Sequence, residues 1–361
     1  MDSILEERLE VIEPILNFQK VRYTKLNELI PLEYARGKRV NIYINLNSIL
    51  NYFYSENIIS SMNSLKGSEY LIFVPEFINL MAHYRHYFWS KFGTRTRFFI
   101  YYLNEPVKKA KHINKKYCKK YIDRLDSSDI KTGVMNDILK TIFKMIDKII
   151  LYIPECYFLN SMGNDLSVIP YYIIKRLNKV KNHQAHIVIT HDYYDFQMLN
   201  LKDTMILSPA GNKSKSYFLN NIYDKKMKNC KYELENNINP ELFSLLLSIS
   251  GYKDRNIEKI QGFAKTIKKL DSLISTGILE NEYSTDIKNI SELLNIDYDT
   301  LYNNFLLTDL KIQEKSLTKT NKQLIGNKLI NLRDNTALMN LNSDYFRFNN
   351  LQLIELCEGE D

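Results

Sequence analysis

Short apolar runs alternate with longer amphipathic segments along residues 38–210. The runs are rich in β-branched and aromatic residues, which predicts strands over residues 40–46, 97–102, 151–159, 186–190 and 204–207. Between them, apolar residues recur every three or four positions, which predicts helices over residues 75–92, 136–150 and 165–177 and a short helical turn over 195–199. Strands separated by helices indicate an α/β fold with a parallel sheet, whose ligands bind at the carboxyl ends of the strands. Those ends fall at Asn45 and at residues 102–105, 160–165 and 190–195.

From about residue 238 the pattern becomes helical. Pro240 opens a helix that stops at Gly251, and a loop then leads through Gly262 to a further helix ending at Ser275. Two short helices joined by a glycine turn expose backbone N–H groups that can bind phosphate. Such turns are also common between helices that only pack in a hydrophobic core. Residues 297–307 and 323–332 are amphipathic, and residues 346–356 form an apolar segment suited to pack on the core.

Composition narrows the class of protein. The chain has 361 residues and 45% hydrophobic residues, enough for about two domains, and its 11 Gly and 8 Pro exclude a collagen-like or low-complexity chain. No apolar run approaches the ~18 residues that a membrane helix needs, and the acidic segment 1–13 is unlike a signal peptide. The four cysteines are widely spaced without a CxxC pair, which indicates neither a zinc site nor a disulfide framework. We therefore expect a soluble protein that is neither secreted nor associated with a membrane.

Positive charge is concentrated in particular segments of a chain whose formal net charge is +7. Residues 95–124 hold ten basic and two acidic residues, and helical spacing places several of the lysines on one stripe. Such a stripe can neutralise a run of phosphates, or it can be a solvated helix face. Further basic residues flank the glycine turn of the helical region. The candidate nucleic-acid-binding residues are Lys108, Lys109, Lys111, Lys115, Lys116, Lys119, Lys253, Arg255, Lys259, Gly262 and Lys265.

Five segments stand in an order that resembles a known family. They are IYINLNSIL (42–50), FFIYYLNEP before the lysine-rich stripe (98–106), NSMGNDLSVIPYYI (160–173), IVITHDYYDFQML (187–199) and LSISGYKDRNIEKIQGFAKT (247–266). The series resembles the flap-endonuclease-like 5′-nucleases, the family of phage ribonuclease H and 5′-3′ exonuclease, over about residues 38–280. The resemblance implies a PIN/FEN-like α/β core over 38–237 with a basic helical arch at 105–125 and a helix-hairpin-helix region over 238–310. An N-terminal extension over 1–37 would precede the core, and a segment over 311–361 would close on it.

Several acidic positions of that family hold other residues in this chain. Two-metal hydrolysis of a phosphodiester needs a cluster of carboxylates, because Mg²⁺ prefers oxygen ligands and its charge must be balanced. Asn45 stands where the family's first strand ends in Asp, and Tyr194 stands at the second Asp of the fourth segment. Tyr252 and Arg255 stand where the hairpin loop has acids. The remaining acids are Asp165, Asp192 and Asp195, as remnant catalytic residues, with Asp165 and Asp192 as metal ligands if the protein is active.

Three hypotheses follow. The first is a catalytically impaired or inactive 5′-nuclease-like protein without a cofactor, which binds branched or single-stranded DNA or RNA through the arch and the hairpin. The second is an active Mg²⁺- or Mn²⁺-dependent 5′-3′ exonuclease or flap endonuclease that uses the three acids and Glu105. The third is a non-enzymatic subunit or virion-associated scaffold with a protein partner. The excess of Asn, Lys, Ile and Tyr indicates an AT-rich genome, typical of a phage or another virus, and hence a place in the host cytoplasm or the virion.

Overall fold

The computed structural model describes most of the core and of the helical region. The described residues are 29–30, 32–47, 69–93, 96–102, 142–148, 150, 153, 155–160, 165–180, 183–190, 192–208, 215–218, 242–252, 257–276 and 286–330. The arch at 105–125 and the segments 1–28 and 331–361 lie outside them.

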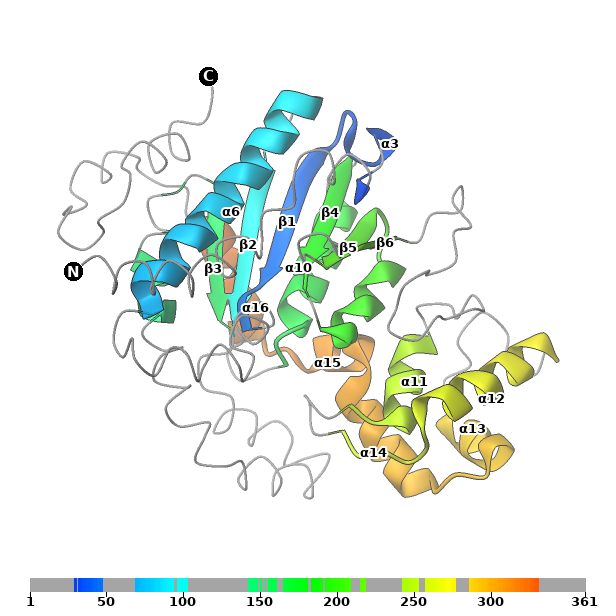
Figure 1. Cartoon of the computed structure of the whole chain (residues 1–361). Helices are drawn as coiled ribbons and strands as arrows, with labels where there is room; N and C mark the ends of the chain where they lie inside the picture. The colour runs from blue at the N-terminus through cyan, green and yellow to red at the C-terminus, as the bar shows by residue number, and fades with distance from the viewer. Residues whose placement is uncertain are drawn as a thin grey trace, which may run out of the picture.

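The described strands form one sheet with the order β3-β2-β1-β4-β5-β6 (Figure 1). The first five strands are parallel, and β6 is antiparallel to β5. The strands are β1 (Arg39–Asn45), β2 (Thr96–Tyr102), β3 (Cys156–Asn160), β4 (Gln184–Ile189), β5 (Thr204–Ser208) and β6 (Lys215–Phe218). The mixed α/β class with a parallel sheet is therefore confirmed. Because β1 pairs with β2 on one side and with β4 on the other, the strand order reverses at β1, where such sheets bind ligands.

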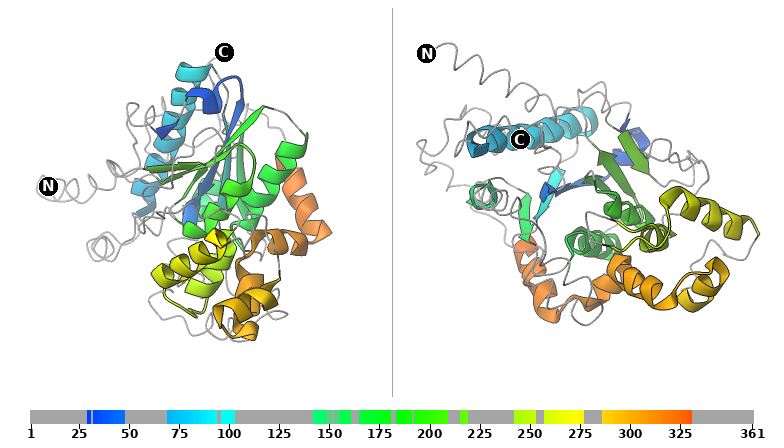
Figure 2. Two further views of the ribbon diagram at one scale, coloured as in Figure 1. Left: turned by 90° about the vertical axis from the view of Figure 1, so that its right-hand side faces the viewer. Right: turned by 60° about the horizontal axis from the view of Figure 1, so that its bottom comes forward.

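Helices cover both faces of the sheet (Figure 2). On one face lie α6 (Glu69–Phe92) and the helical residues 142–148; on the other lie α10 (Val168–Val180) and the 3-10 helix η2 (Tyr193–Asn200). The remaining helices are α3 (Leu32–Ala35), α11 (Phe243–Ser250), α12 (Phe263–Ser275), α13 (Ile287–Leu294), α14 (Tyr298–Thr308), α15 (Leu310–Ser316) and α16 (Lys319–Ile330). None of the described helices is both long enough and apolar enough to cross a membrane.

Several predicted boundaries were wrong. The helix predicted over 165–177 spans Val168–Val180, and the helix predicted to open at Pro240 begins at Phe243. The strand predicted over 151–159 begins only at Cys156, because Ile153 N–H bonds back to the Ile150 carbonyl and Glu155 adopts a positive φ of 56°, which makes a turn before the strand. The helix predicted to begin at Pro75 begins at Glu69, so Pro75 lies inside the helix instead of in its first turn.

Two apolar clusters form the core, one on each face of the sheet. The first joins the sheet to α6 and to residues 142–150, and the second joins the other face to α10, η2 and the helical region. Aromatic rings at matched register positions cross three strands, with Tyr43 on Phe99 at 4.9 Å and Phe99 on Tyr157 at 5.0 Å between ring centroids. These rings are buried, so they pack the core and do not offer surfaces on which nucleic-acid bases could stack.

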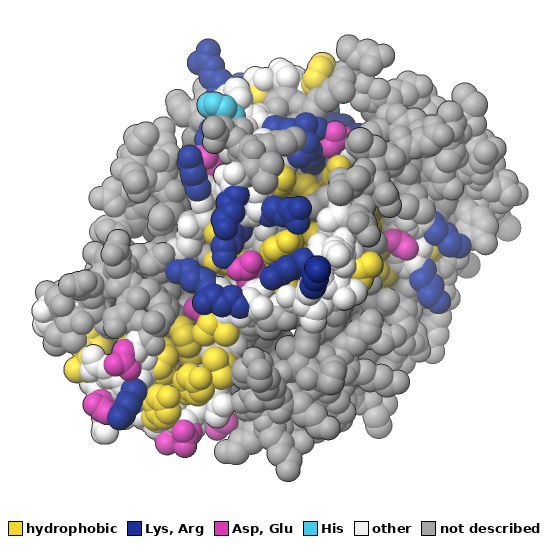
Figure 3. All heavy atoms as spheres, turned by 180° about the vertical axis from the view of Figure 1, so that it is seen from behind, with side chains coloured by type: hydrophobic (Ala, Val, Ile, Leu, Met, Phe, Trp, Pro, Cys, Tyr) yellow, Lys and Arg dark blue, Asp and Glu magenta, His cyan; other side chains and the backbone are white. Residues whose placement is uncertain are grey.

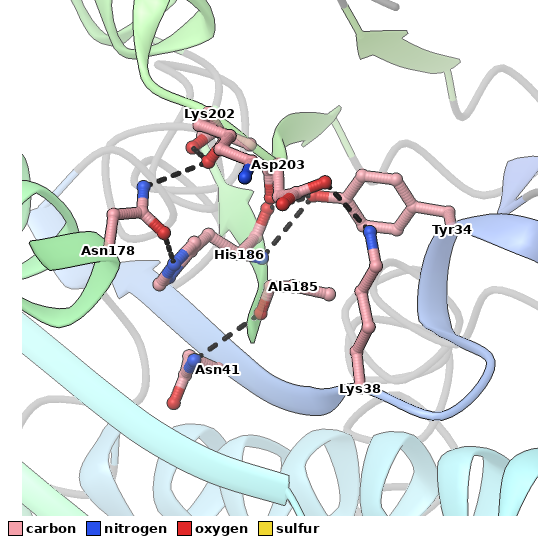
Figure 4. A network of polar contacts seen from close by, with 9 residues as sticks. Tyr34, Lys38, Asn41, Asn178, Ala185, His186, Lys202 and Asp203 are labelled. Atoms are coloured by element: carbon pink, nitrogen blue, oxygen red, sulfur yellow. Dashed lines mark hydrogen bonds and ion pairs between the residues drawn. The ribbon is translucent and has the colours of Figure 1, made fainter. Parts of the chain in front are cut away.

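A polar network fixes α3 to the amino end of the sheet (Figure 4). The Tyr34 hydroxyl contacts the carbonyl oxygens of His186, at 2.6 Å, and Asp203, and Lys38 Nζ lies 2.7 Å from the Asp203 carboxylate. Burial lowers the pKa of His186 to about 3, so its ring is neutral. Its Nε2 lies 3.0 Å from Asn178 Oδ1 and its Nδ1 lies 3.0 Å from the Tyr43 hydroxyl. This histidine therefore has a packing role.

Candidate functional site at the carboxyl edge of the sheet

Polar side chains replace apolar ones where the central strands end. Asn45 is the last residue of β1, and Thr190 directly follows β4, the strand beside it. Ser167 directly precedes α10, and Asp195 lies in the first turn of η2. All four side chains are buried, although each carries a polar group. The point at which the strand order reverses is therefore filled by a polar cluster inside the protein.

Asp195 is the centre of this cluster, and its carboxylate accepts four hydrogen bonds. Its Oδ2 accepts from Asn45 Nδ2 at 3.0 Å, Thr190 Oγ1 at 2.6 Å and the Tyr101 hydroxyl at 3.3 Å. Its Oδ1 accepts from the Ser167 hydroxyl. Each carboxylate oxygen offers two lone pairs, so three donors crowd Oδ2 while Oδ1 accepts one. All four donors are electrically neutral.

Burial changes the protonation of Asp195. Loss of solvent raises its pKa to about 6, and the nearby charge of Asp192 raises it as well. The hydrogen bonds from Ser167, Thr190 and Asn45 act in the opposite direction, because they stabilise the charged form. None of the four groups that donate hydrogen bonds to Asp195 is a cation.

Asp192 connects the sheet to the helical region. It caps η2, with its Oδ1 accepting from the Tyr194 N–H at 2.9 Å, and the same oxygen accepts from the Tyr252 hydroxyl at 2.9 Å. Its own N–H donates to Thr190 Oγ1 at 3.0 Å, and Thr190 in turn donates to Asp195. Asp192 is partly exposed, so it faces the solvent side of the same cluster.

Asp165 is linked to Asp195 through Ser167. Its Oδ1 accepts from the Ser167 N–H at 2.9 Å, and its carbonyl accepts from the Val168 N–H at 3.2 Å, where α10 begins. Ser167 thus touches two acids, Asp165 through its N–H and Asp195 through its hydroxyl. The structure places all three predicted acids at one edge of the sheet and joins them through two hydroxyl residues. Their roles in catalysis or metal binding remain predictions.

The described residues do not fit a pair of divalent cations. They contain no group of three or more His, Cys, Asp or Glu residues able to hold a metal ion. Asp195 is buried and accepts four hydrogen bonds from protein donors, and Asp165 and Asp192 accept from backbone N–H groups in turns. Tyr194, which stands at an acidic position of the resembling family, is buried and donates to the Leu307 carbonyl at 2.7 Å. That position therefore packs the helical region against the sheet.

The helix–turn–helix corner is built around Gly251. This residue ends α11 with a φ of 72°, and a Cβ atom there would lie 2.6 Å from the Cα of Lys259. Tyr252 and Ile257 pair as an antiparallel bridge, and the N–H groups of Ile260 and Gln261 both donate to the Ile249 carbonyl, at 3.0 and 2.9 Å. The corner is thus closed by backbone bonds, and α12 begins immediately after it.

The predicted nucleic-acid-binding residues are only partly described. Lys259 and Lys265 are exposed on the corner and on α12, and Gly262 lies between them. Lys253 and Arg255 lie outside the described residues. The predicted arch residues Lys108, Lys109, Lys111, Lys115, Lys116 and Lys119 also lie outside them.

The predicted strand ends included Asn45 and Thr190 but not Ser167 or Tyr101, the other two donors to Asp195. Ser167 lies within the helix predicted over 165–177 and Tyr101 within the strand predicted over 97–102, so neither stood at a predicted strand end. A usable signal was present at Asn45 and Thr190, because each polar residue directly follows an otherwise apolar strand.

Comparisons with known proteins found similarity to solved structures. No family model and no curated protein matches the sequence. The structure is similar to a mutant of T5 5′-exonuclease, with 13% identity over 81% of this chain and 98% of that chain and a TM-score of 0.43. It is also similar to human GEN1 in complex with Holliday junction DNA, with 13% identity over 94% of this chain and 76% of that chain and a TM-score of 0.44. Identity and TM-score are both too low to carry over an activity.

Proposed function

We propose that this chain is a 5′-nuclease-like protein that binds branched or single-stranded DNA or RNA and has little or no nuclease activity. One observation carries the proposal: a buried carboxylate with four neutral donors, Asp195, fills the edge of the sheet where the resembling nucleases hold metal ions. The composition, rich in Asn, Lys, Ile and Tyr, supports a role in phage or other viral replication or assembly.

Charge balance supports the loss of metal chemistry. Two divalent ions bring four positive charges, and the described edge offers Asp165, Asp192 and the buried Asp195. At an effective dielectric of about 20, each missing charge pair at ~4 Å removes about 4 kcal/mol of gross attraction. The same loss of acids lowers the repulsion of phosphates, so binding can persist after cleavage is lost.

Binding is assigned to the arch and the helical corner. The sequence places a lysine stripe over 108–119 within the arch, and the exposed Lys259 and Lys265 flank the closed backbone corner. Neutralising phosphates in this way releases counterions, which makes affinity depend steeply on salt.

A cleavage assay tests the loss of activity. The full chain is incubated with an end-labelled 5′-flap substrate in Mg²⁺ or in Mn²⁺, beside an Asp192→Ala variant. We expect no cleavage by the wild-type protein above that of the variant. Cleavage that the Asp192→Ala change abolishes would establish an active metal-dependent nuclease and overturn the proposal.

A salt titration tests the binding. Flap and single-stranded probes are titrated with wild-type protein and with a variant in which Lys108, Lys111, Lys115 and Lys119 are changed to Gln. We expect the salt slope for single strands to fall by about 0.7 for each phosphate contact removed. Absence of affinity for every probe, or affinity without a salt slope, would leave the scaffold hypothesis instead.

A further inference from the structure

A second positively charged surface lies on the rear of the molecule, away from the carboxyl edge. Figure 3 shows Lys and Arg side chains gathered on the face opposite α6, over the helices that cover this side of the sheet. These helices are α10, α15 and α16. Their described basic side chains are Lys175, Arg176, Lys179, Lys311, Lys315, Lys319 and Lys322.

The described residues of these three helices carry a large excess of basic side chains. Glu314 is the one acidic residue of the three helices, and it pairs with Lys175 at 2.6 Å. Seven basic side chains against one acid leave an excess of six positive charges, nearly as large as the +7 of the entire chain. An excess of this kind raises the local concentration of a polyanion and speeds its association.

Contacts between the helices hold the surface together. The Lys175–Glu314 pair joins α10 to α15, and Lys322 Nζ of α16 lies 5.9 Å from the centre of the Tyr172 ring on α10. Arg176 donates to the hydroxyl of the same tyrosine at 3.1 Å. Tyr172 is therefore a spacer that keeps two cations of different helices beside each other.

We propose that this rear surface, formed by α10, α15 and α16, binds the phosphate backbone of a nucleic-acid duplex without reading its sequence. The cations of α10 lie between Lys175 and Lys179, which at 1.5 Å per residue span about 6 Å, or about two base pairs of 3.4 Å rise, and the cations of α15 and α16 extend the surface. The cations of α10 begin about 10 Å beyond Val168, where the helix leaves the carboxyl edge. The surface is thus separate from the edge that holds Asp195.

The surroundings of the cations favour a duplex over two other partners. A protein partner needs an apolar or aromatic anchor, and among the described residues of these helices Leu324 is the one exposed large hydrophobic side chain. A single strand needs free aromatic faces on which bases stack, whereas Tyr172 already packs between Lys322 and Arg176. A duplex backbone requires only spaced cations.

The test uses a covalently closed duplex, which has neither a 5′ end nor a branch. Binding of the full chain is titrated with salt for the wild type and for a rear triple variant, Arg176→Gln, Lys179→Gln and Lys315→Gln. A matched control triple, Lys91→Gln, Lys144→Gln and Lys288→Gln, removes equally exposed cations from other surfaces. Circular dichroism and thermal melting confirm that both variants fold.

We expect the rear triple to lower the salt slope by about 2.7 and the control triple to leave it unchanged. The affinity ratio of wild type to rear variant is then about 40-fold larger at 50 mM than at 200 mM salt. Equal effects of the two triples, or no effect of the rear triple, would overturn the proposal. If the rear triple variant lost binding to a poly-glutamate probe but bound the duplex as the wild type does, the partner would be an acidic protein. That result would overturn the proposal as well.

This inference shares with the proposed function only the choice of nucleic acid as the polyanion. Loss of flap binding with retained binding of the closed duplex would refute the proposed function alone. Retained flap binding with no effect of the rear triple on the closed duplex would refute the rear surface alone.

Discussion

Replacing Asn45 by Asp restores the acid that the resembling nucleases carry at the end of their first strand. The amide nitrogen that now donates to Asp195 Oδ2 at 3.0 Å would become a second carboxylate oxygen. Two unit charges at that distance repel by about 5 kcal/mol at an effective dielectric of about 20. The change also removes a hydrogen bond to a charged acceptor, worth about 1.5–3 kcal/mol.

In the Asn45→Asp variant, the carboxylates at positions 45 and 195 reduce their repulsion by holding one proton between them. Asp195, whose pKa is already raised to about 6, takes up that proton, and its pKa rises further. Because the folded state then binds a proton that the unfolded state releases, stability falls as pH rises, by about 1.4 kcal/mol per unit between the unfolded and folded pKa values. We expect Asn45→Asp to lower the free energy of unfolding by about 2–4 kcal/mol at pH 8 and by less at pH 5.

Urea unfolding at pH 5 and pH 8 measures this difference, and Asn45→Ala is the matched control. The alanine variant loses the hydrogen bond without adding charge. Because that bond lowers the pKa of Asp195, the cost of Asn45→Ala should also be larger at pH 8 than at pH 5, but by less than the cost of Asn45→Asp. If Asn45→Asp showed no more pH dependence than Asn45→Ala, the contact between position 45 and Asp195 would be refuted. The wild-type transition should not move when Mg²⁺ is added, since a shift would contradict the poor fit of the edge to metal ions.

Three further predictions concern Asp195, Gly251 and Tyr34. In the wild type, the raised pKa of Asp195 should lower the free energy of unfolding by up to about 3 kcal/mol as pH rises from about 4 to about 6. Asp195→Asn should abolish this pH dependence, which is measured by comparing the pH profiles of unfolding of the two proteins. Gly251→Ala should cost about 2–4 kcal/mol in denaturant unfolding, because φ is positive and the new Cβ meets backbone, whereas Gly262→Ala, with no atom within 4 Å, should cost less than about 1 kcal/mol. Equal costs would contradict the close approach at the corner. Tyr34→Phe should lower the free energy of unfolding by about 1–2 kcal/mol through the lost bond to the His186 carbonyl, and an unchanged melting curve would argue against that bond.

Local pattern was sufficient to predict most of the fold. The strands around 40–46, 97–102, 186–190 and 204–207 were predicted within two residues at each end, because buried parallel strands are continuous apolar runs. The end of α11 at Gly251 was predicted as well, since glycine commonly follows a helix in a left-handed conformation. The strand β6 was missed, because basic residues surround KSYF and its partner in the sheet lies seven or more residues away.

The candidate site was less predictable, because its partners come from distant parts of the chain. Asn45 and Asp195 are 150 residues apart, and Tyr101 and Asp195 are 94 apart. Spacing along the sequence carries no information about such contacts. The order of the strands brings these residues together, and that order depends on packing of the whole sheet.

The central position of β1 has a consequence for synthesis on the ribosome. β1 can pair with β2 once residue 102 has emerged, but its second neighbour, β4, ends at residue 189. At about 5–20 residues per second, the nascent β1–β2 pair waits about 4–17 s with its β4-facing edge unpaired. An open edge of this kind can pair with another chain. Slower translation between these two points would therefore increase aggregation of the newly made protein, and chaperone binding there would reduce it.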